Sequence, residues 1–413
     1  MEDGRVTRGS PKAGLPRLRL RVTPTAEWKL RSGHPWLYSD SIVEQNRHGL
    51  TGELAVIYDR YDNFLGIGFY DPDSPIRVRV LHTGKPKEID EAFWASRLRV
   101  ALEHRAGLFD EDTNGYRIVH GENDGWPGLV VDRYSTTLVV KIYSAIWFPR
   151  LSEISELFDR DLHSQRIVLR LSRNLQSAAR GSRFSDGQVL RGEPLSKPVV
   201  FKESGLGFEA DVLQGQKTGF FLDQRENRRA VESLARGRDV LNLFSFSGGF
   251  SVYAARGGAT SVTDVDISDH ALESAKQNFH LNRAVPSVAS CRHLTVKADA
   301  FEWIAGSSRS RFDLIVVDPP SLAKRESERE RALNAYRGLL EQAVQRLRSD
   351  GILVASSCSA HVSADEFYSI VRRTAQQSGR VFKEIQTTRH PPDHPATFAE
   401  ANYLKTIYLG FSS

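Results

Sequence analysis

Residues 240–266, VLNLFSFSGGFSVYAARGGATSVTDVD, constrain the fold more than any other stretch of the chain. An apolar run of strand length is followed by a glycine turn, a helix-compatible segment, and a second strand that ends at Asp266. Parallel strands that are covered on both faces have continuous apolar sequences, and a helix usually connects them. The stretch therefore predicts a βαβ unit within a doubly wound α/β sheet.

The turn and the following carboxylate predict a site for a nucleoside. Gly248 and Gly249 let a ligand approach the backbone, and Asp266, eighteen residues after Gly248, can accept hydrogen bonds from both ribose hydroxyls. The dinucleotide pattern G-x-G-x-x-G is absent from the turn, so nothing here shapes a pyrophosphate site. S-adenosylmethionine, which has no phosphate, fits better than NAD. The alternative is a tight turn without a ligand.

The length of 413 residues indicates two or three domains, and the net charge is +5. The first 31 residues hold eight Lys or Arg against three acidic residues, which suggests a polyanionic partner such as RNA or DNA. For residues 1–16 the alternative is a solvated, disordered basic tail. Two cysteines are too few for a disulfide framework, and we find no membrane span or signal-peptide core. We therefore expect a cytoplasmic protein with no membrane partner.

Residues 17–84 have the pattern of a small β barrel. Apolar Leu18, Leu20 and Val22 alternate with arginines, and three further strands are predicted at 52–58, 64–70 and 76–81. We expect Trp36 and Tyr38 to be core residues of this barrel. RNA contact is the favoured interpretation for the arginines Arg19, Arg21 and Arg31.

Residues 85–198 predict a middle α+β domain. A linker helix over about 88–108 is expected to leave Arg97, Arg99 and Arg105 outside. Strands at 129–134 and 138–143, a helix near 149–160 and a strand at 166–171 should follow. The polar segment 174–198 has the composition of an exposed loop and domain boundary.

Residues 199–413 alternate strands with helices, and the further strands are expected at 293–299, 312–317, 352–357, 381–388 and 403–411. In a doubly wound sheet, ligands bind at the carboxyl ends of the strands. Segment 213–228 is expected to cover one wall of the site, with Asp223 as the N-cap of a helix. The alternative is that its polar residues form only a helix cap and surface salt bridges. The residues expected at the strand ends are Gly248, Asp266, Asp299, Asp318 and Cys358.

Asp318 and Cys358 carry the predicted chemistry. Pro319 and Pro320 stiffen the turn that holds the Asp318 carboxylate toward a flat ligand. A Cys358 thiolate can add to C6 of a pyrimidine and make C5 nucleophilic toward a sulfonium methyl group, while Asp318 hydrogen-bonds or protonates N3. The alternative for Cys358 is a buried structural thiol, which is the interpretation we give Cys291.

Nine motifs together resemble the bacterial 23S ribosomal RNA large-subunit methyltransferase I family, of the cytosine-C5 type. They are HPWLYSDSI, ENDGWPGLVVDRY, GQKTGFFLDQREN, NLFSFSGGFS, DVDIS, DPPSLAK, SCSAHVS, RHPPDHP and YLK. The resemblance implies a PUA-like domain at the barrel, a middle domain and a class I methyltransferase domain. It implies 23S ribosomal RNA or a large-subunit precursor as partner, leaves a homodimer open, and implies no metal.

The resemblance also assigns site residues. Cys358 is implied as the nucleophile, with Asp318 beside it. S-adenosylmethionine is implied at Asp223, Arg225, Asn242, Phe244, Ser245, Phe246, Gly248, Asp266, Ile267, Asp299, Ala300 and Asp318. RNA contacts are predicted at Arg19, Arg21, Arg31, Lys217 and Lys324.

One difference from the wider group of RNA cytosine-C5 methyltransferases concerns the base that removes the C5 proton. Those enzymes commonly carry a second cysteine after the proline of the fourth strand, whereas the turn here reads Asp318-Pro319-Pro320-Ser321, so this base stays unassigned. Two alternatives remain. One is a methyltransferase for a purine nitrogen without a covalent adduct, and the other is a non-catalytic RNA-binding or ribosome-assembly factor.

Overall fold

The computed structural model describes residues 16–181, 183–306 and 310–412. Apart from Pro16, the predicted basic tail lies outside the described residues. The chain divides into two compact units. The N-terminal unit runs to Trp94 and includes Tyr143–Ile154, and the C-terminal unit comprises Ala95–Ile142 and Ser155 onward. The sheet of the middle segment therefore shares one compact unit with the C-terminal sheet.

The N-terminal unit is built on a six-stranded sheet in the order β2-β6-β5-β4-β1-β3. As the alternating pattern predicts, Leu18, Leu20 and Val22 are buried. The strands are β1 (Leu18–Val22), β2 (Trp36–Tyr38), β3 (Ile42–Gln45), β4 (Leu54–Tyr58), β5 (Phe64–Tyr70) and β6 (Ile76–Thr83). Trp36 and Tyr38 are half-buried, so the expectation that they are core residues is wrong.

Helix α1 (Pro24–Arg31) and the strands β2 and β3 were not predicted from the sequence. Local signals for α1 exist, because the Thr23 hydroxyl accepts a hydrogen bond from the Ala26 amide and Pro24 occupies the first helical position. Only Ala26 and Leu30 are buried along this helix, so it lacks the wide apolar stripe by which helices are recognised.

An aromatic cluster explains why residues 143–154 belong to the N-terminal unit. The Phe69 ring lies 5.8 Å from Trp94 and 5.2 Å from Trp147, and the two indoles are 5.3 Å apart. All three side chains are buried. Rings at these separations pack favourably beyond their area alone, so the cluster ties three distant chain segments together.

The middle sheet has the order β11-β10-β9-β8-β7, and only β9 and β10 pair in parallel. Its strands are β7 (Gly115–His120), β8 (Leu129–Tyr134), β9 (Thr137–Ile142), β10 (Arg166–Leu171) and β11 (Val189–Arg191), with helix α3 (Leu151–Leu162) between β9 and β10. The polar segment expected to be a loop thus contributes the short strand β11.

Helix α2 (Glu91–Glu103) is shorter than predicted, and Arg105 is buried rather than exposed. Its guanidinium donates to both carboxylate oxygens of Asp124, at 2.7 and 3.3 Å, and to the Arg117 carbonyl. The apolar pattern cannot reveal this position, because the ion pair makes burial of a charged side chain tolerable.

The C-terminal sheet has the order β16-β15-β14-β17-β18-β20-β19, in which β20 runs antiparallel to both of its neighbours, β18 and β19. The order in which successive strands are added reverses beside β14, which pairs in parallel with β15 on one side and with β17 on the other. The strands are β14 (Asp239–Leu243), β15 (Ser261–Asp266), β16 (Arg292–Lys297), β17 (Phe312–Val317), β18 (Leu347–Ser357), β19 (Val381–Thr388) and β20 (Lys405–Ser412). The hairpin of β12 (Val199–Glu203) and β13 (Leu206–Ala210) precedes them.

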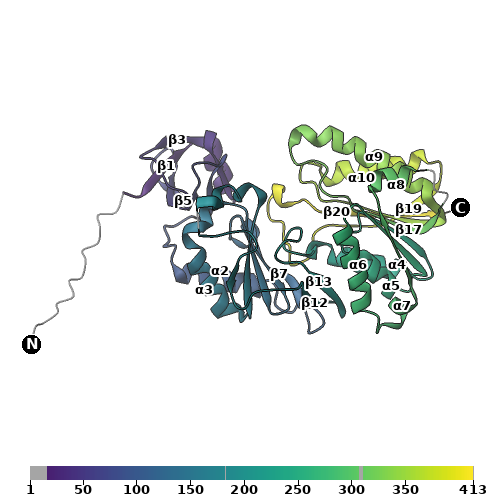
Figure 1. Cartoon of the computed structure of the whole chain (residues 1–413). Coiled ribbons are helices and arrows are strands. Elements are labelled where there is room, and N and C mark those ends of the chain that lie inside the picture. The colour runs from purple at the N-terminus through teal and green to yellow at the C-terminus, as the bar shows by residue number, and fades with distance from the viewer. Residues whose placement is uncertain (1–15, 182, 307–309, 413) are drawn as a thin grey trace, which may run out of the picture. The chain divides into compact units, whose positions relative to one another are not determined.

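Helices cover both faces of this sheet, as expected for a doubly wound fold (Figure 1). On β14, Val240 packs into one core and its neighbour Leu241 into the other. One face carries α4 (Arg225–Leu234), α5 (Gly249–Arg256), α6 (Asp269–Leu281) and α7 (Pro286–Ser290), and the other α8 (Ala300–Ala305), α9 (Arg329–Arg346) and α10 (Ala364–Gln377).

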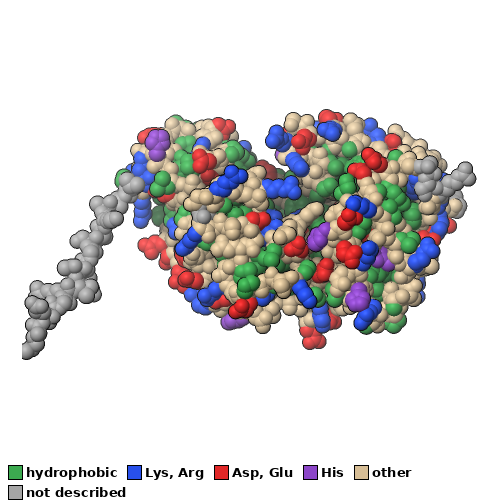
Figure 2. Space-filling model, in the orientation of Figure 1, with side chains coloured by type: hydrophobic (Ala, Val, Ile, Leu, Met, Phe, Trp, Pro, Cys, Tyr) green, Lys and Arg blue, Asp and Glu red, His purple; other side chains and the backbone are tan. Residues whose placement is uncertain are grey.

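One face of the chain mixes charges of both signs. On the face drawn in Figure 2, Lys and Arg side chains are interspersed with Asp and Glu. Among the described residues, no helix combines the length and the apolar character that crossing a membrane requires.

Candidate active site

The loop after β14 has an unusual backbone that positions the site. Phe244 and Phe246 have φ angles of 58° and 47°, and Gly248 has 69°. Left-handed conformations of non-glycine residues are costly and cluster at ligand sites. A Cβ on Gly248 would lie 2.9 Å from the Ala275 Cβ, so this glycine lets the turn approach α6.

A cavity of about 300 Å³ opens in front of this loop, at the carboxyl ends of β14, β15, β17 and β18. This is where the strand order of a doubly wound sheet places a ligand. The residues that line it are Gln216, Lys217, Phe220, Phe221, Asp223, Gln224, Arg228, Phe244–Ser247, Gly249, Phe250, Asp266, Ile267, Asp299–Phe301, Asp318–Pro320, Cys358 and Leu404.

One end of the cavity suits an adenosine. The Asp266 carboxylate accepts hydrogen bonds from the Phe246 and Ser268 amides, both at 2.9 Å, which fix its position at the end of β15. Exposed Ile267 and half-buried Phe301 supply apolar surface for a flat base. Asp299 caps α8 by accepting hydrogen bonds from the Phe301 and Glu302 amides.

Three buried polar atoms that lack hydrogen-bond partners among the described residues belong to cavity residues. They are the Ser245 and Ser247 hydroxyl oxygens and Oδ1 of Asp223. An unsatisfied buried polar atom costs about 1–3 kcal/mol, so a ligand with complementary groups is expected. The carboxylate and ammonium of an amino acid moiety meet that need, and the residues present therefore fit S-adenosylmethionine.

Asp223 is held by tertiary contacts and does not cap the following helix. Its Oδ2 accepts hydrogen bonds from Lys217 Nζ at 2.6 Å and from the Tyr403 hydroxyl at 2.8 Å, whereas Gln224 is the N-cap residue of α4. The predicted N-cap role is therefore wrong. Burial alone would raise the pKa of Asp223, but the Lys217 ammonium lowers it below its ordinary value. The carboxylate is consequently ionised at neutral pH.

Asp318 and Cys358 lie at the ends of neighbouring parallel strands and line the same cavity. Burial, with a further contribution from the Asp223 charge, raises the pKa of Asp318 to about 7. The Cys358 thiol donates a weak hydrogen bond to the Pro319 carbonyl at 3.8 Å. Burial and the nearby Asp318 carboxylate raise the pKa of Cys358 to about 12. A carboxyl that can carry a proton near pH 7 thus accompanies a protonated thiol.

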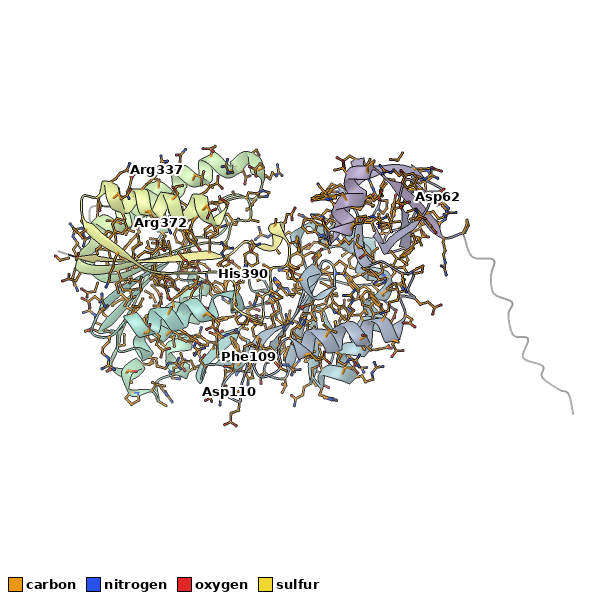
Figure 3. The ribbon with its side chains drawn as sticks, turned by 180° about the vertical axis from the view of Figure 1, so that it is seen from behind. Asp62, Phe109, Asp110, Arg337, Arg372 and His390 are labelled. Atoms are coloured by element: carbon orange, nitrogen blue, oxygen red, sulfur yellow. The ribbon has the colours of Figure 1, made fainter. Side chains whose placement is uncertain are left out.

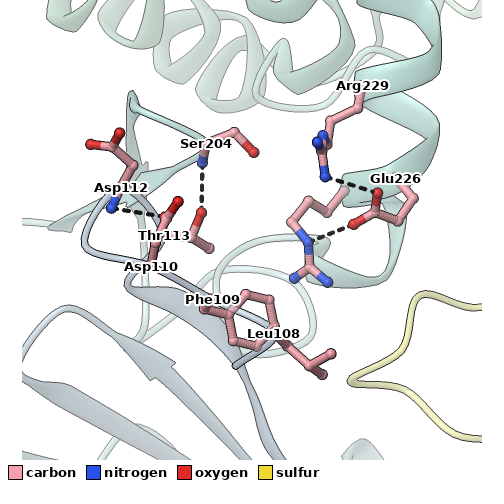
Figure 4. A pocket seen from close by; sticks show the side chains of 9 residues that line it. Leu108, Phe109, Asp110, Asp112, Thr113, Ser204, Glu226 and Arg229 are labelled. Carbon is pink, nitrogen blue, oxygen red and sulfur yellow. Dashed lines mark hydrogen bonds and ion pairs between the residues drawn. The ribbon is translucent and has the colours of Figure 1, made fainter. Parts of the chain in front are cut away.

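Three residues predicted to bind the cofactor do not line the cavity. Gly248 packs against α6 instead, and buried Asn242 donates hydrogen bonds of 2.9 Å to Ser251 and Asp264. Buried Arg225 forms an ion pair with Asp393 at 2.8 Å and lies at a second cavity of about 280 Å³ (Figure 4). All three residues therefore make contacts within the fold rather than with the cofactor cavity.

Several residues of the cavity were not predicted from the sequence, and Gln224 and Phe301 are two of them. Gln224 donates to the Asp318 carboxylate, and Phe301 packs edge-on against Phe244 with ring centres 5.3 Å apart. A signal was present for each, since Gln224 belongs to the GQKTGFFLDQREN motif and Phe301 follows the predicted Asp299 and Ala300. Neither motif says which of its side chains faces a ligand.

The arginines predicted to bind RNA contact carboxylates or an aromatic ring within the N-terminal unit. Arg21 forms ion pairs with Glu44 at 2.9 Å and with Asp62 at 3.0 Å, the latter labelled in Figure 3. Arg31 pairs with Asp59 and Glu27, and the Arg19 guanidinium lies 4.5 Å from the centre of the Tyr58 ring. In the C-terminal unit, Lys217 lines the cavity and Lys324 is exposed just beyond Pro320.

Comparison with known families agrees with this geometry. The S-adenosylmethionine-dependent methyltransferase family matches residues 116–409, and the PUA-like domain matches residues 20–83. The chain belongs to this methyltransferase family. S-adenosylmethionine is its cofactor, and the C-terminal sheet is its methyltransferase fold.

Individual relatives match along nearly the whole chain. A ribosomal RNA large subunit methyltransferase of Deinococcus radiodurans is 57% identical over 407 residues, covering 97% of this chain and 99% of the relative. Ribosomal RNA large subunit methyltransferase I of Escherichia coli strain SMS-3-5 is 34% identical, with 94% and 98% covered. The crystal structure of SMU.776 in complex with SAH shares the fold, with a TM-score of 0.80, 23% identity, and 95% and 99% covered.

Proposed function

We propose that this methyltransferase forms 5-methylcytosine in 23S ribosomal RNA, in the cytoplasm, through a covalent adduct with Cys358. The observation that carries the proposal is that Asp318 and Cys358 line the cavity that also contains the unpartnered polar atoms of Ser245, Ser247 and Asp223. The relatives' names support ribosomal RNA as the substrate class. The PUA-like domain is consistent with an RNA partner.

Cys358 and Asp318 act together on the target base in this proposal. When bound, S-adenosylmethionine supplies an electrophilic methyl group. The Cys358 thiolate adds to C6 of cytosine, and Asp318 in its protonated form donates that proton to N3, which absorbs the developing negative charge. Because the pKa of Asp318 is raised to about 7, a substantial fraction carries the proton at neutral pH.

The adduct makes C5 electron-rich, and C5 forms the new bond to the methyl group as the bond from that methyl to the sulfonium sulfur breaks and S-adenosylhomocysteine leaves. The C5 proton then leaves to a base, and the electron pair that held it re-forms the C5–C6 double bond as the thiolate is expelled and N3 returns its proton to Asp318. Gln224 keeps the Asp318 carboxylate in place through a hydrogen bond of 2.8 Å. Pro319 and Pro320 line the cavity and restrict the backbone of the turn that follows Asp318.

Lys217 and Lys324 are proposed to contact the RNA backbone near the target nucleotide, with Arg19, Arg21 and Arg31 contributing from the N-terminal unit. Lys324 is exposed, and its backbone amide, rather than its side chain, is used in a hydrogen bond to Glu328. Phosphate contacts position a nucleic acid without reading its sequence. These cations are therefore expected to affect RNA affinity more than base choice.

A second candidate is methylation of a purine nitrogen with Cys358 as a structural thiol. The observation that favours it is the thiol itself, whose pKa is raised to about 12 by burial, so that little thiolate is present without substrate. The proposed covalent mechanism therefore requires that the bound base or a neighbouring charge favour the thiolate.

The test is methylation of 23S ribosomal RNA from a strain that lacks the gene, followed by mass spectrometry of the nucleosides. We expect 5-methylcytidine from the wild-type enzyme and from Cys291→Ala, and none from Cys358→Ala. A methylated purine in place of 5-methylcytidine would overturn the cytosine assignment. Full activity of Cys358→Ala would overturn the covalent mechanism.

A further inference from the structure

Lys405 is a buried cation beside the strand that carries Cys358. It is the first residue of β20 and pairs with Ser357 of β18, the residue before Cys358. The residue is only 1% exposed. Among the residues that the structure describes, no carboxylate lies within ion-pair distance of its ammonium. Burying an unpaired charge costs folding free energy, so a buried lysine at this position is expected to have a specific role.

The ammonium of Lys405 is bound entirely by backbone carbonyls. It donates hydrogen bonds to the carbonyl of Ser359 at 2.5 Å, to that of Tyr403 at 3.2 Å, and to that of Val362. Three acceptors require three N–H donors, and only the charged form of lysine has three. Although burial lowers the pKa of Lys405 to about 8, the charged form still predominates at neutral pH.

These contacts fix the turn that presents the thiol. Ser359 directly follows Cys358, and its hydroxyl accepts hydrogen bonds from the Leu322 and Ala323 amides at 3.1 and 3.3 Å. Lys405 therefore holds, through Ser359, both the turn after Cys358 and the loop that follows Pro320. A nucleophile that is held in this way needs little reorganisation when substrate arrives.

The charges around Cys358 come from several elements. Asp318 and Asp223 oppose ionisation of the thiol, whereas Lys217 and Lys405 favour it. Tyr336 of α9 also faces this group, and its hydroxyl donates to Ser357 at 2.9 Å. Lys217 is already paired with Asp223 at 2.6 Å. Lys405 has no such partner among the described side chains, so its charge is not neutralised.

We propose that Lys405 is a positioning residue for Cys358, whose buried ammonium both fixes the turn carrying the thiol and stabilises the thiolate. This inference rests on the proposed role of Cys358 as a nucleophile. The covalent mechanism requires a charge that favours the thiolate, and the buried Lys405 ammonium next to the cavity residue Leu404 is such a charge.

The test measures the thiolate directly in the full chain, with Cys291→Ala as background so that one thiol remains. Iodoacetamide alkylates the thiolate, forming the S–C bond as iodide leaves, while the thiol proton passes to the buffer. The alkylation rate is recorded at pH 7 and pH 7.5, where Lys405 is mostly charged, for Lys405→Met, Lys405→Arg and Lys383→Met. Lys383 is exposed on β19 and serves as the matched control.

Far below the pKa of the thiol, the rate is proportional to the small thiolate fraction, so we expect Lys405→Met to alkylate about tenfold more slowly than the parent. Lys405→Arg should keep a rate near that of the parent, and Lys383→Met should not change it. An unchanged rate in folded Lys405→Met would overturn the inference. If that variant does not fold, Lys405→Gln, which retains two donors for the carbonyls, gives the same test.

The alkylation experiment needs neither RNA nor methyl transfer, so its failure is separable from failure of the proposed function. An unchanged alkylation rate in Lys405→Met together with loss of methylation in Cys358→Ala would reject the role of Lys405 alone. For methylation itself, Lys405→Met is expected to lower kcat about tenfold while leaving the KM for RNA within about twofold. A rise in KM alone would contradict the inference.

Discussion

The side-chain amide of Gln224 donates a hydrogen bond of 2.8 Å to Oδ2 of Asp318. Gln224 is itself fixed, because its amide oxygen accepts a hydrogen bond from Asn227. No described residue hydrogen-bonds the other oxygen of Asp318, and the residue lines the cavity. The carboxyl is thus anchored through one oxygen and can carry a proton on the other, which is the arrangement needed to donate to a base.

The raised pKa of Asp318 predicts a pH-dependent stability difference. Because its pKa in the folded chain is about 7, the folded state prefers the protonated form, and the associated stability is complete below about pH 4 and lost as pH rises through 7. Asp318→Asn should therefore melt higher than wild type at pH 8, by about 4 °C, and equally at pH 4. Exposed Asp350→Asn should show no such trend; the same trend in both would contradict the assignment.

Asp266 is predicted to bind the ribose of the cofactor. Losing two hydrogen bonds to a carboxylate should raise the Kd for S-adenosylmethionine about 10- to 100-fold in Asp266→Ala, measured by isothermal titration calorimetry. The control is Asp269→Ala, nearby on α6, where the carboxylate is exposed and pairs with Lys297. Equal affinities of the two variants would exclude Asp266 from the cofactor site.

Arg225 is predicted to stabilise the fold rather than to bind the cofactor. Its removal leaves the fully buried Asp393 carboxylate without its guanidinium partner, so Arg225→Ala should lose about 3 kcal/mol of unfolding free energy. Exposed Arg229→Ala should lose less than about 1 kcal/mol. Urea titration measures both. A weakened Kd for S-adenosylmethionine in a folded Arg225 variant would restore the cofactor role.

The cations proposed to bind RNA should differ in their effects. Lys324→Gln is expected to weaken binding of 23S ribosomal RNA and to lower the slope of log K against log salt by about one. Arg21→Gln should lower it less, because two carboxylates already neutralise this arginine. Arg337→Gln, exposed on α9 (Figure 3), is the control. Filter binding at several salt concentrations measures all three, and equal slopes would contradict the proposal.

Much of the C-terminal sheet could be predicted because strand-like and helix-like segments alternate along the sequence. The strands at 261–266, 312–317 and 381–388 have the bounds expected from the sequence. Their parallel order also predicted that Asp318 and Cys358 would share one edge, since the carboxyl ends of parallel strands lie on the same side.

The sequence could not reveal the buried charges. Arg225 pairs with Asp393 across 168 residues, and Arg105 reaches the Asp393 carbonyl across 288. Such partners have no local signal, and charged residues are rarely buried without them. Lys405 was hidden for the same reason, because its acceptors are backbone carbonyls that every residue carries.

The most direct test of the account is covalent trapping on 23S ribosomal RNA transcribed with 5-fluorocytidine. Fluorine at C5 cannot leave as a proton, so an enzyme that attacks C6 through sulfur stays attached to the RNA after methyl transfer. We predict a denaturation-resistant protein–RNA complex that requires S-adenosylmethionine, forms with Cys291→Ala, and is absent with Cys358→Ala. A complex that persists in Cys358→Ala, or no complex with an enzyme that methylates ordinary RNA, would contradict the account.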